Sequence, residues 1–196
     1  MARESTDIRQ KQIKKAVLEI IAEEGLHNLS TRKLAGRIGL TEGAIFRHYP
    51  SKRDIIKAII DDVAYDLIGS LRSIVISPIN SEEKLFKYLC RNVKYLKENN
   101  GITILLFSEA THLGDKDLKE KLNQILDEQK QFIIKMVKDG IAENIWDKNI
   151  NPEDVAVMYM GIPITFNIEF VLNKSRLDTD NFCNKMYSLM IKTLKK

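Results

Sequence analysis

One stretch of the sequence, residues 30–53 (STRKLAGRIGLTEGAIFRHYPSKR), restricts the possible folds more than any other. Ser30 can accept a hydrogen bond from the first free N–H groups of a helix, and apolar residues follow it at helical spacing as far as Ile38. Gly39 then stands where a helix commonly ends in a left-handed residue, a conformation that glycine adopts at little cost. The pattern predicts a short helix that ends in a tight turn.

A second short helix follows this turn. Thr41 is a good N-cap, and the helix is expected over residues 42–48. Pro50 ends it, because a proline disfavours helical backbone at the residue before it. Ser51 begins the next helix and has the spacing of a capping box with Asp54. Two short helices joined by a tight turn form a helix-turn-helix, whose second helix lies in the major groove of DNA.

Several residues of the second helix and just beyond it can contact DNA. Arg47 can donate to a base edge or to a phosphate, and His48 and Lys52 lie one turn further on, within reach of the phosphate backbone. Gly43 costs the helix about 1 kcal/mol relative to alanine. Either its bare backbone allows DNA to approach closely, or a first helical turn simply tolerates glycine, and the sequence leaves both explanations open.

The glycine that closes the preceding helix, the two helices and the residues after Pro50 share their spacing with a known family. The matching positions are Gly25, residues 30–35, residues 39–41, residues 45–49, Lys52 and Ile55. Over about the first third of the chain, the sequence resembles the DNA-binding domain of the TetR family of bacterial transcription regulators. The resemblance implies that DNA is contacted by Thr31, Arg32, Thr41, Gly43, Ala44, Phe46, Arg47, His48 and Lys52.

The chain departs from the family at Phe46, where a tyrosine is usual. Phenylalanine has no hydroxyl group, so the usual hydrogen bond to a phosphate is not expected here. The contact of the aromatic ring with the DNA backbone remains.

The charge distribution agrees with a DNA-binding N-terminal part. The whole chain carries a formal charge of only +4. Residues 1–53 hold 11 Lys and Arg against 6 Asp and Glu, a net +5, and residues 54–196 hold 20 against 21, a net −1. The positive excess therefore belongs to the N-terminal part, as phosphate binding requires.

The remaining sequence predicts an all-α fold of two domains, a head (residues 1–53) and a helical effector-binding and dimerisation domain (residues 54–196). In the head, apolar residues at helical spacing over 13–21 predict a helix that Gly25 ends. No linker follows residue 53, because apolar residues continue at helical spacing from Ile55 to Leu71. Further helices are expected at 81–98, 102–112, 115–141, 153–173 and 178–194.

The segment Val155–Leu172 is apolar enough to resemble a membrane span, but Pro163, Asn167 and Glu169 and the polar flanks argue against one. Such a helix is more simply buried on two sides, by its own core and by a partner. The family resemblance implies a homodimer formed by the last two helices of each chain. A dimer also fits a helix-turn-helix that reads a palindromic operator on double-stranded DNA.

The resemblance also implies a small effector, bound in the helical domain, that releases DNA. Pro163 is expected to kink its helix, which opens space for a ligand or serves packing alone. An apolar or amphipathic molecule, such as a fatty acyl derivative, is expected. Aromatic and methionine side chains at helical spacing belong to a core more often than to a pocket. The residues considered as pocket lining are Phe107, Glu109, His112, Met136, Met158, Phe166, Glu169 and Phe170.

Other chemistry is weakly supported. Cys90 and Cys183 stand 93 positions apart, which indicates neither a metal site nor a redox pair, and free buried thiols in a reducing cytosol are expected. No metal, cofactor or catalytic motif is found, and the N-terminus does not resemble a signal peptide. The sequence predicts a cytoplasmic, dimeric regulator, a repressor that an effector releases. The alternative is an architectural or recruiting DNA-binding protein of the same fold without an effector.

Overall fold

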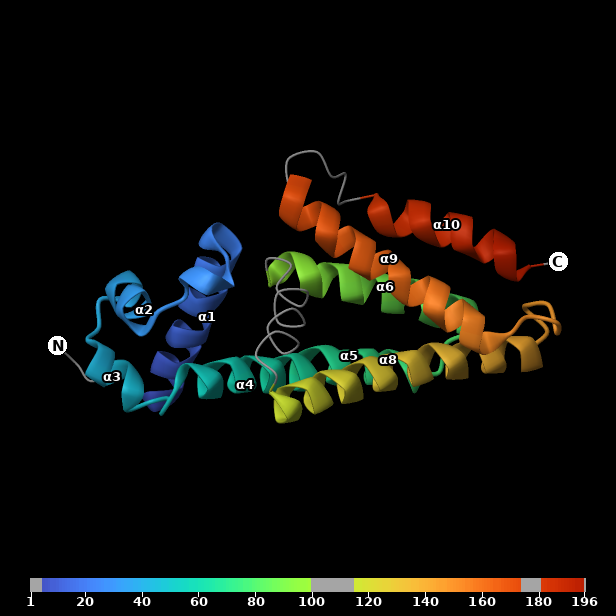
Figure 1. Ribbon diagram of the computed structural model, residues 1–196. Coiled ribbons are helices and arrows are strands. Elements are labelled where there is room, and N and C mark those ends of the chain that lie inside the picture. Colours follow the sequence, from blue (N-terminus) through green and yellow to red (C-terminus); the bar gives the residue numbers. More distant parts are fainter. Residues whose placement is uncertain (1–4, 100–114, 174–180, 196) are drawn as a thin grey trace.

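The computed structural model describes residues 5–99, 115–173 and 181–195, and these residues form an all-helical protein without strands (Figure 1). The predicted all-α fold is confirmed. The predicted helix at 102–112 lies outside the described residues. The helices are α1 (Thr6–Glu24), the 3-10 turn η1 (Leu26–Asn28), α2 (Thr31–Ile38), α3 (Glu42–Phe46), α4 (Lys52–Val63), the π-helical turn η2 (Ala64–Ile68), α5 (Gly69–Val75), α6 (Ser81–Glu98), α8 (Lys116–Ala142), α9 (Pro152–Asn173) and α10 (Phe182–Leu194).

Helices α1, α2 and α3 form a small head at one end of the molecule, and α4 completes its core (Figure 1). The predicted apolar face of α1 is buried, with Ile13 and Ile20 fully enclosed. Leu34 of α2 and Ile45 of α3 join the same core. Burying side chains of this size contributes roughly 1.5–3 kcal/mol each, so a head this small depends on its shared core with α4.

The local signals of the helix-turn-helix act as predicted. The Ser30 hydroxyl accepts a hydrogen bond from the N–H of Lys33 at 3.2 Å, and Gly39 adopts the left-handed conformation with φ of 66°. The Thr41 hydroxyl accepts from the N–H of Ala44 at 3.2 Å. Helix α3 ends at Phe46, two residues before the predicted end, because the chain tightens and the carbonyl of Ile45 accepts from both residue 48 and residue 49.

The predicted continuous helix out of the head is present as α4, η2 and α5, which run without a break from Lys52 to Val75 (Figure 1). The π-helical turn in the middle was not predicted. Ile55 and Ile59 of α4 are buried in the core of the head, and Leu67 and Leu71 are buried in the helical domain. The division of the chain after residue 53 stays a prediction, since α4 belongs to both parts.

The helical domain is built by α5, α6, α8 and α9, with α10 packed on α6 (Figure 1). The largest side chains that are fully buried are Tyr88 of α6 and Tyr159 and Phe166 of α9. The Tyr159 hydroxyl donates to the backbone carbonyl of Leu85 and so ties α9 to α6. Asn80 caps α6 by accepting from the N–H of Glu83 at 2.8 Å.

By length and composition alone, α9 could span a membrane. In this structure it packs against α6 and α8, and 33% of its most apolar window is buried. A helix that is apolar all round fits a soluble protein when both its faces are covered, one by its own core and one by a partner.

At Gly140, near the end of α8, there is no room for a larger side chain. A Cβ atom on Gly140 would lie 2.2 Å from the ring of Trp146, which is buried. We expect Gly140→Ala to lower the free energy of unfolding by about 1–3 kcal/mol, although alanine is the better helix former. Urea unfolding followed by the fluorescence of Trp146, the single tryptophan of the chain, measures this.

The matched control is Gly36→Ala in α2, where an added Cβ meets no described atom within 4 Å. This variant is expected to keep or raise the stability by up to roughly 1 kcal/mol. Equal stabilities for the two variants would show that the ring of Trp146 does not restrict position 140.

Candidate functional site

The residues predicted to touch DNA come together at the outer end of the head, on the first turn of α2, on α3 and at the start of α4 (Figure 1). Those that are exposed are Arg32, Thr41, Gly43, Phe46 and Arg47. Those that are half-buried are Thr31, Ala44, His48 and Lys52. No described atom of the head lies within 4 Å of a Cβ placed on Gly43, so its side of α3 faces open space.

Phe46 presents its ring to solvent, with 45% of the residue exposed. A large apolar side chain in this position contributes nothing to the core of the head. It stands one residue from Arg47, which is also exposed. An aromatic ring beside a cation, on the surface of a helix-turn-helix, fits contact with a sugar-phosphate backbone.

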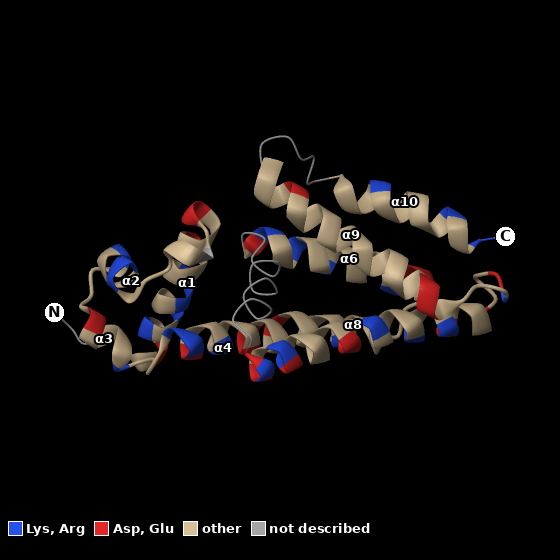
Figure 2. Ribbon diagram, in the orientation of Figure 1, with Lys and Arg blue, Asp and Glu red and all other residues tan. Residues whose placement is uncertain are grey.

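Figure 2 shows Lys and Arg, in blue, on the helices of the head, and those of the helix-turn-helix form two groups that differ in whether they are paired. Lys33 and Arg37 pair with Glu24 and Glu23 of α1, the latter pair at 2.7 Å, and so hold α2 against α1. Arg37 lowers the pKa of the Glu23 carboxyl through this hydrogen bond. In contrast, Arg32, Arg47 and Lys52 make no ion pair with any residue that the structure describes. The second group is the one available for phosphates.

Two further contacts fix the position of α3, the second helix of the helix-turn-helix. The Thr31 hydroxyl donates to the carboxylate of Glu42 at 2.6 Å, which joins the start of α2 to the start of α3. The side chain of Gln10 donates to the backbone carbonyl of His48 at 3.4 Å and so joins the end of the motif to α1. The head therefore presents α3 on a preformed frame.

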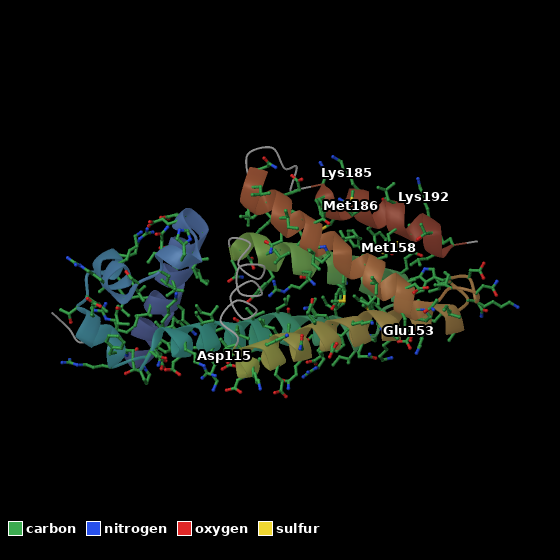
Figure 3. The ribbon with its side chains drawn as sticks, viewed as in Figure 1. Asp115, Glu153, Met158, Lys185, Met186 and Lys192 are labelled. Atoms are coloured by element: carbon green, nitrogen blue, oxygen red, sulfur yellow. The ribbon has the colours of Figure 1, made fainter. Side chains whose placement is uncertain are left out.

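An ion-pair cluster joins the head to the helical domain. The Arg53 guanidinium donates to both carboxylate oxygens of Asp115, one of them at 3.0 Å, and to Asp117 at 2.7 Å. Figure 3 shows Asp115 at the end of α8 that lies beside α4. Lys121, one turn further along α8, pairs with Asp61 of α4 at 2.5 Å. The start of α8 is thus held to both the beginning and the end of α4.

Asp115 also caps α8, because its carboxylate accepts from the N–H groups of Asp117 and Leu118 at 3.1 and 3.2 Å. The hydrogen bond from Arg53, with these backbone bonds, lowers the pKa of Asp115 to about 2. No local sequence pattern indicates this pair, because Arg53 and Asp115 are 62 positions apart.

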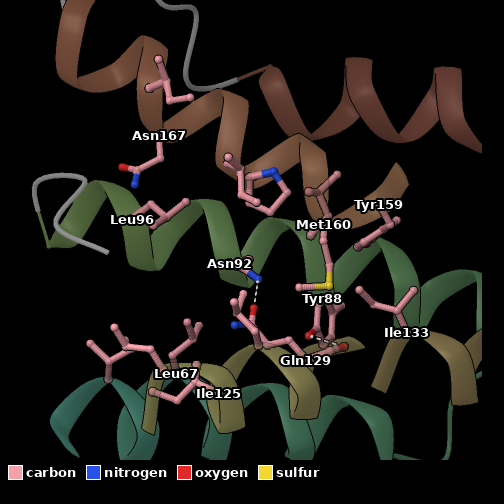
Figure 4. Close-up of a pocket in the computed structure, with 17 residues that line it drawn as sticks. Leu67, Tyr88, Asn92, Leu96, Ile125, Gln129, Ile133, Tyr159, Met160 and Asn167 are labelled. Carbon is pink, nitrogen blue, oxygen red and sulfur yellow. Dashed lines mark hydrogen bonds between the residues drawn. The ribbon is translucent and has the colours of Figure 1, made fainter. Parts of the chain in front are cut away.

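A cavity of about 310 Å³ lies inside the helical domain, between the α4–η2 connection, α6, α8 and α9 (Figure 4). None of the described residues that line it carries a charged side chain. Ile164 and Ile168 of α9 line it and are also exposed, so the cavity approaches the surface beside α9. The lining residues are Val63, Leu67, Tyr88, Leu89, Asn92, Leu96, Leu122, Ile125, Leu126, Gln129, Ile133, Tyr159, Met160, Pro163, Ile164, Asn167 and Ile168.

A few neutral polar groups interrupt the apolar wall. The side-chain amide of Asn92 donates to the side-chain carbonyl of Gln129 at 3.0 Å (Figure 4). The Tyr88 hydroxyl donates to the backbone carbonyl of Gln129 at 3.4 Å. Burial, and then the nearby charge of Glu128, raise the pKa of Tyr88, which keeps this phenol neutral at physiological pH. The site suits an apolar or neutral portion of a ligand.

The residues named from the sequence as pocket lining are not the ones that line this cavity. Met136, Phe166 and Phe170 are buried in the core, and Met158 and Glu169 are exposed on α9. The lining comes from their neighbours, such as Tyr159 and Ile168, because a helix apolar on all sides carries no pattern that marks the side facing a cavity. Pro163 does line it. Phe107, Glu109 and His112 lie outside the described residues.

Comparison with known proteins agrees with both parts of the site. Residues 13–59 match the family described as bacterial regulatory proteins, tetR family, and residues 61–193 match the C-terminal region of YsiA-like protein. A nucleoid occlusion factor, SlmA of Actinobacillus pleuropneumoniae, is 25% identical over 128 residues, which are 65% of this chain and 63% of that protein. The match therefore spans less than two thirds of the length of that relative.

Solved structures share the fold over nearly the whole chain. The ketosteroid transcriptional regulator KstR2 of Mycobacterium tuberculosis superposes with a TM-score of 0.83 at 16% identity and covers 100% of this chain and 97% of its own. The regulator FadR of Bacillus subtilis, solved with stearoyl-CoA, superposes with a TM-score of 0.74 at 21% identity, over 94% of this chain and 98% of its own. With the two family matches covering most of its length, this chain belongs to the TetR family of bacterial transcription regulators.

Proposed function

We propose that the protein is a cytoplasmic, homodimeric repressor that binds a palindromic DNA operator and leaves it when a small apolar or amphipathic effector fills the cavity. One observation carries the proposal. The helical connection that begins at Lys52, on the DNA-binding face, also lines the cavity with Val63 and Leu67. A ligand that displaces these side chains acts on the same helix that positions the head.

The second group of basic residues supports the DNA-binding part of the proposal. Arg32, Arg47 and Lys52 lie on the same end of the head as Phe46, and their charges are not used within the described fold. We propose Lys52 and Arg32 as phosphate contacts and Arg47 as a contact to a base edge or a phosphate. Thr31, Thr41, Gly43, Ala44 and His48 complete the proposed DNA surface.

The proposed effector carries an acyl chain or an apolar body of similar size. The cavity volume falls at the lower end of the range of about 300–1,000 Å³ that small-molecule sites occupy. The described residues of its wall offer no counter-ion, so a charged head group would remain at the opening beside Ile164 and Ile168. The FadR structure contains stearoyl-CoA, a molecule of this chemical form, in a protein of the same fold.

The proposed dimer interface is the outer face of α9 together with α10. Apolar residues along α9 are exposed in the single chain, among them Val157 at 63% and Leu172 at 72%, and Leu189 of α10 is exposed at 59%. Large apolar side chains that gather on an exposed face are typical of a surface that another chain covers. Met158 of α9 and Met186 of α10 can be followed in Figure 3. A second copy of the chain is the proposed cover.

We consider a second function because the SlmA relatives are named as nucleoid occlusion factors. On this alternative the protein binds DNA to organise it or to recruit another protein, and no effector controls it. The two functions differ in whether an occupied cavity weakens DNA binding.

Selection of bound fragments from random duplex DNA, at near-physiological salt, tests the DNA-binding proposal. A dimer with two reading heads should enrich a palindrome whose half-sites are about 34 Å apart or a multiple of that distance. Enrichment of a single half-site would exclude the paired heads, and the absence of any enriched sequence would exclude sequence-specific reading.

Lys52→Ala tests the phosphate contact. We expect weaker binding to all DNA sequences alike, and a salt dependence of log K that is flatter by about 0.9 for each phosphate that the variant no longer neutralises. Fluorescence anisotropy at several salt concentrations measures both. Lys94→Ala on α6 removes the same charge from an exposed residue outside the head and should change neither value. An unchanged slope for Lys52→Ala would remove this residue from the phosphate contacts.

The pKa of Asp115 can be used to test the ion-pair cluster that joins the head to the helical domain. Its carboxyl should titrate in NMR with a pKa of about 2, because Arg53 stabilises the ionised form. A lowered folded-state pKa means that the pair stabilises the protein above the ordinary aspartate pKa and that this contribution is lost as the pH falls towards 2.

Arg53→Met should return the pKa of Asp115 towards its ordinary value of 3.8. The control is Arg72→Met, which removes another arginine–carboxylate pair, from α5 to Glu128 of α8, and should leave Asp115 unchanged. An ordinary pKa for Asp115 in the unmodified protein would contradict the link.

Leu126→Trp tests the cavity as the effector site. The larger side chain fills the space between α8 and α9, so an acyl-CoA that raises the melting temperature of the unmodified protein should no longer do so. At a ligand concentration of about 100 times Kd, the melting temperature of the unmodified protein should rise by roughly 5–10 °C, and that of Leu126→Trp should not rise. Ile76→Trp, at an exposed position at the end of α5, should keep the full rise. A full rise in Leu126→Trp would place the ligand elsewhere.

A further inference from the structure

Helices α6 and α10 lie side by side and run in opposite directions (Figure 1). The Tyr187 hydroxyl donates to the backbone carbonyl of Glu82 at 2.7 Å, and Lys195 pairs with the Glu82 carboxylate at 3.0 Å. One turn further along α6, the ring of Phe86 meets the ring of Tyr187 edge-on with centroids 5.1 Å apart. These contacts fix the register of the two helices.

The same register brings the two cysteines of the chain together. Cys90 lies one helical turn beyond Phe86 on α6, and Cys183 lies one turn before Tyr187 on α10. Because the two helices are antiparallel, the residue one turn later on α6 lies beside the residue one turn earlier on α10. The side chains of the two cysteines accordingly lie close enough to interact, both thiols are free, and both residues are half-buried. The thiols are free, as the sequence led us to expect, but their 93-position separation gave no sign that the fold brings them together.

The two thiols differ in acidity. Interaction with the Cys90 thiol, and further the charge of Lys97, lower the pKa of Cys183. Interaction with Cys183 and burial raise the pKa of Cys90. Cys183 is therefore the sulfur that more readily becomes a thiolate, which is the reactive form towards oxidants.

We propose that Cys90 and Cys183 are a reversible oxidation site, at which a hydroperoxide joins them in an intramolecular disulfide that holds α10 against α6. The thiolate of Cys183 attacks one oxygen of hydrogen peroxide, which breaks the O–O bond and leaves a sulfenic acid and hydroxide, protonated to water. The sulfur of Cys90 loses its proton and attacks the sulfenic sulfur, and a second water leaves. In total the two sulfurs lose two electrons and the peroxide gains them.

The site lies where such a bond has structural consequences. Helix α6 lines the cavity with Tyr88, Leu89 and Asn92, and α10 carries part of the proposed dimer face. A disulfide between distant parts of a chain stabilises the folded state by restricting the unfolded one, and it does so more for a long enclosed loop. The oxidised protein should therefore unfold at a higher temperature than the reduced protein. Its α10 should also separate less readily from α6.

The test uses the unmodified full-length protein, treated with hydrogen peroxide, alkylated, digested and analysed by mass spectrometry. We expect a peptide pair linked through Cys90 and Cys183, formed within one chain, as shown by migration as a monomer, without a dimer band, on a non-reducing gel. The melting temperature should rise by roughly 5–15 °C and return on treatment with dithiothreitol.

Single variants identify the roles of the two sulfurs. Cys183→Ser should slow the reaction with peroxide more than Cys90→Ser, and neither should show the reversible rise in melting temperature. Recovery of both cysteines as separately oxidised or alkylated residues in the unmodified protein, or of a disulfide between chains, would overturn the proposal. These measurements need no DNA and no effector, so their result does not depend on whether the proposed function is correct.

Discussion

The helix that begins at Lys52 determines how the two parts of this protein relate to each other. Its first half carries Ile55 and Ile59 into the core of the DNA-binding head, and its continuation places Leu67 on the wall of the cavity. Neither core is complete without it. Because packed cores resist continuous deformation, we expect a change in the cavity to move this helix as a body. The π-helical turn between α4 and α5 lies at the cavity, at the junction of the two parts.

Some charges of the head are paired within the fold and others are not, and this division locates the proposed DNA surface. Glu23 and Glu24 of α1 take up the charges of α2 that face them, while Arg47 and Lys52 are left on the outer surface. Arg53, next to Lys52, turns instead to Asp115 at the start of α8. Two neighbouring basic residues thus have different roles in the proposed mechanism: Lys52 faces the proposed DNA surface, and Arg53 holds the helical domain that contains the cavity.

Local signals made most of the fold predictable. Caps at Ser30 and Thr41 and the left-handed Gly39 depend on a few neighbouring residues, and each appears as expected. What the sequence could not provide depends on long-range packing. The residues of α9 that line the cavity differ from those considered from the sequence, because a helix apolar all round has no marked face. The ion pair of Arg53 with Asp115 and the proximity of Cys90 to Cys183 both involve residues far apart in the chain, and no local pattern indicates either.

The most direct test of the account is a titration of the protein bound to its selected operator with acyl-CoA thioesters of increasing chain length, with free coenzyme A as the reference. A cavity lined by apolar and neutral residues predicts release of DNA that strengthens as the acyl chain lengthens towards the size of the cavity, and no release by free coenzyme A. A complex that no acyl chain disturbs, or that free coenzyme A disturbs equally, would contradict the claim that the cavity controls the DNA-binding head.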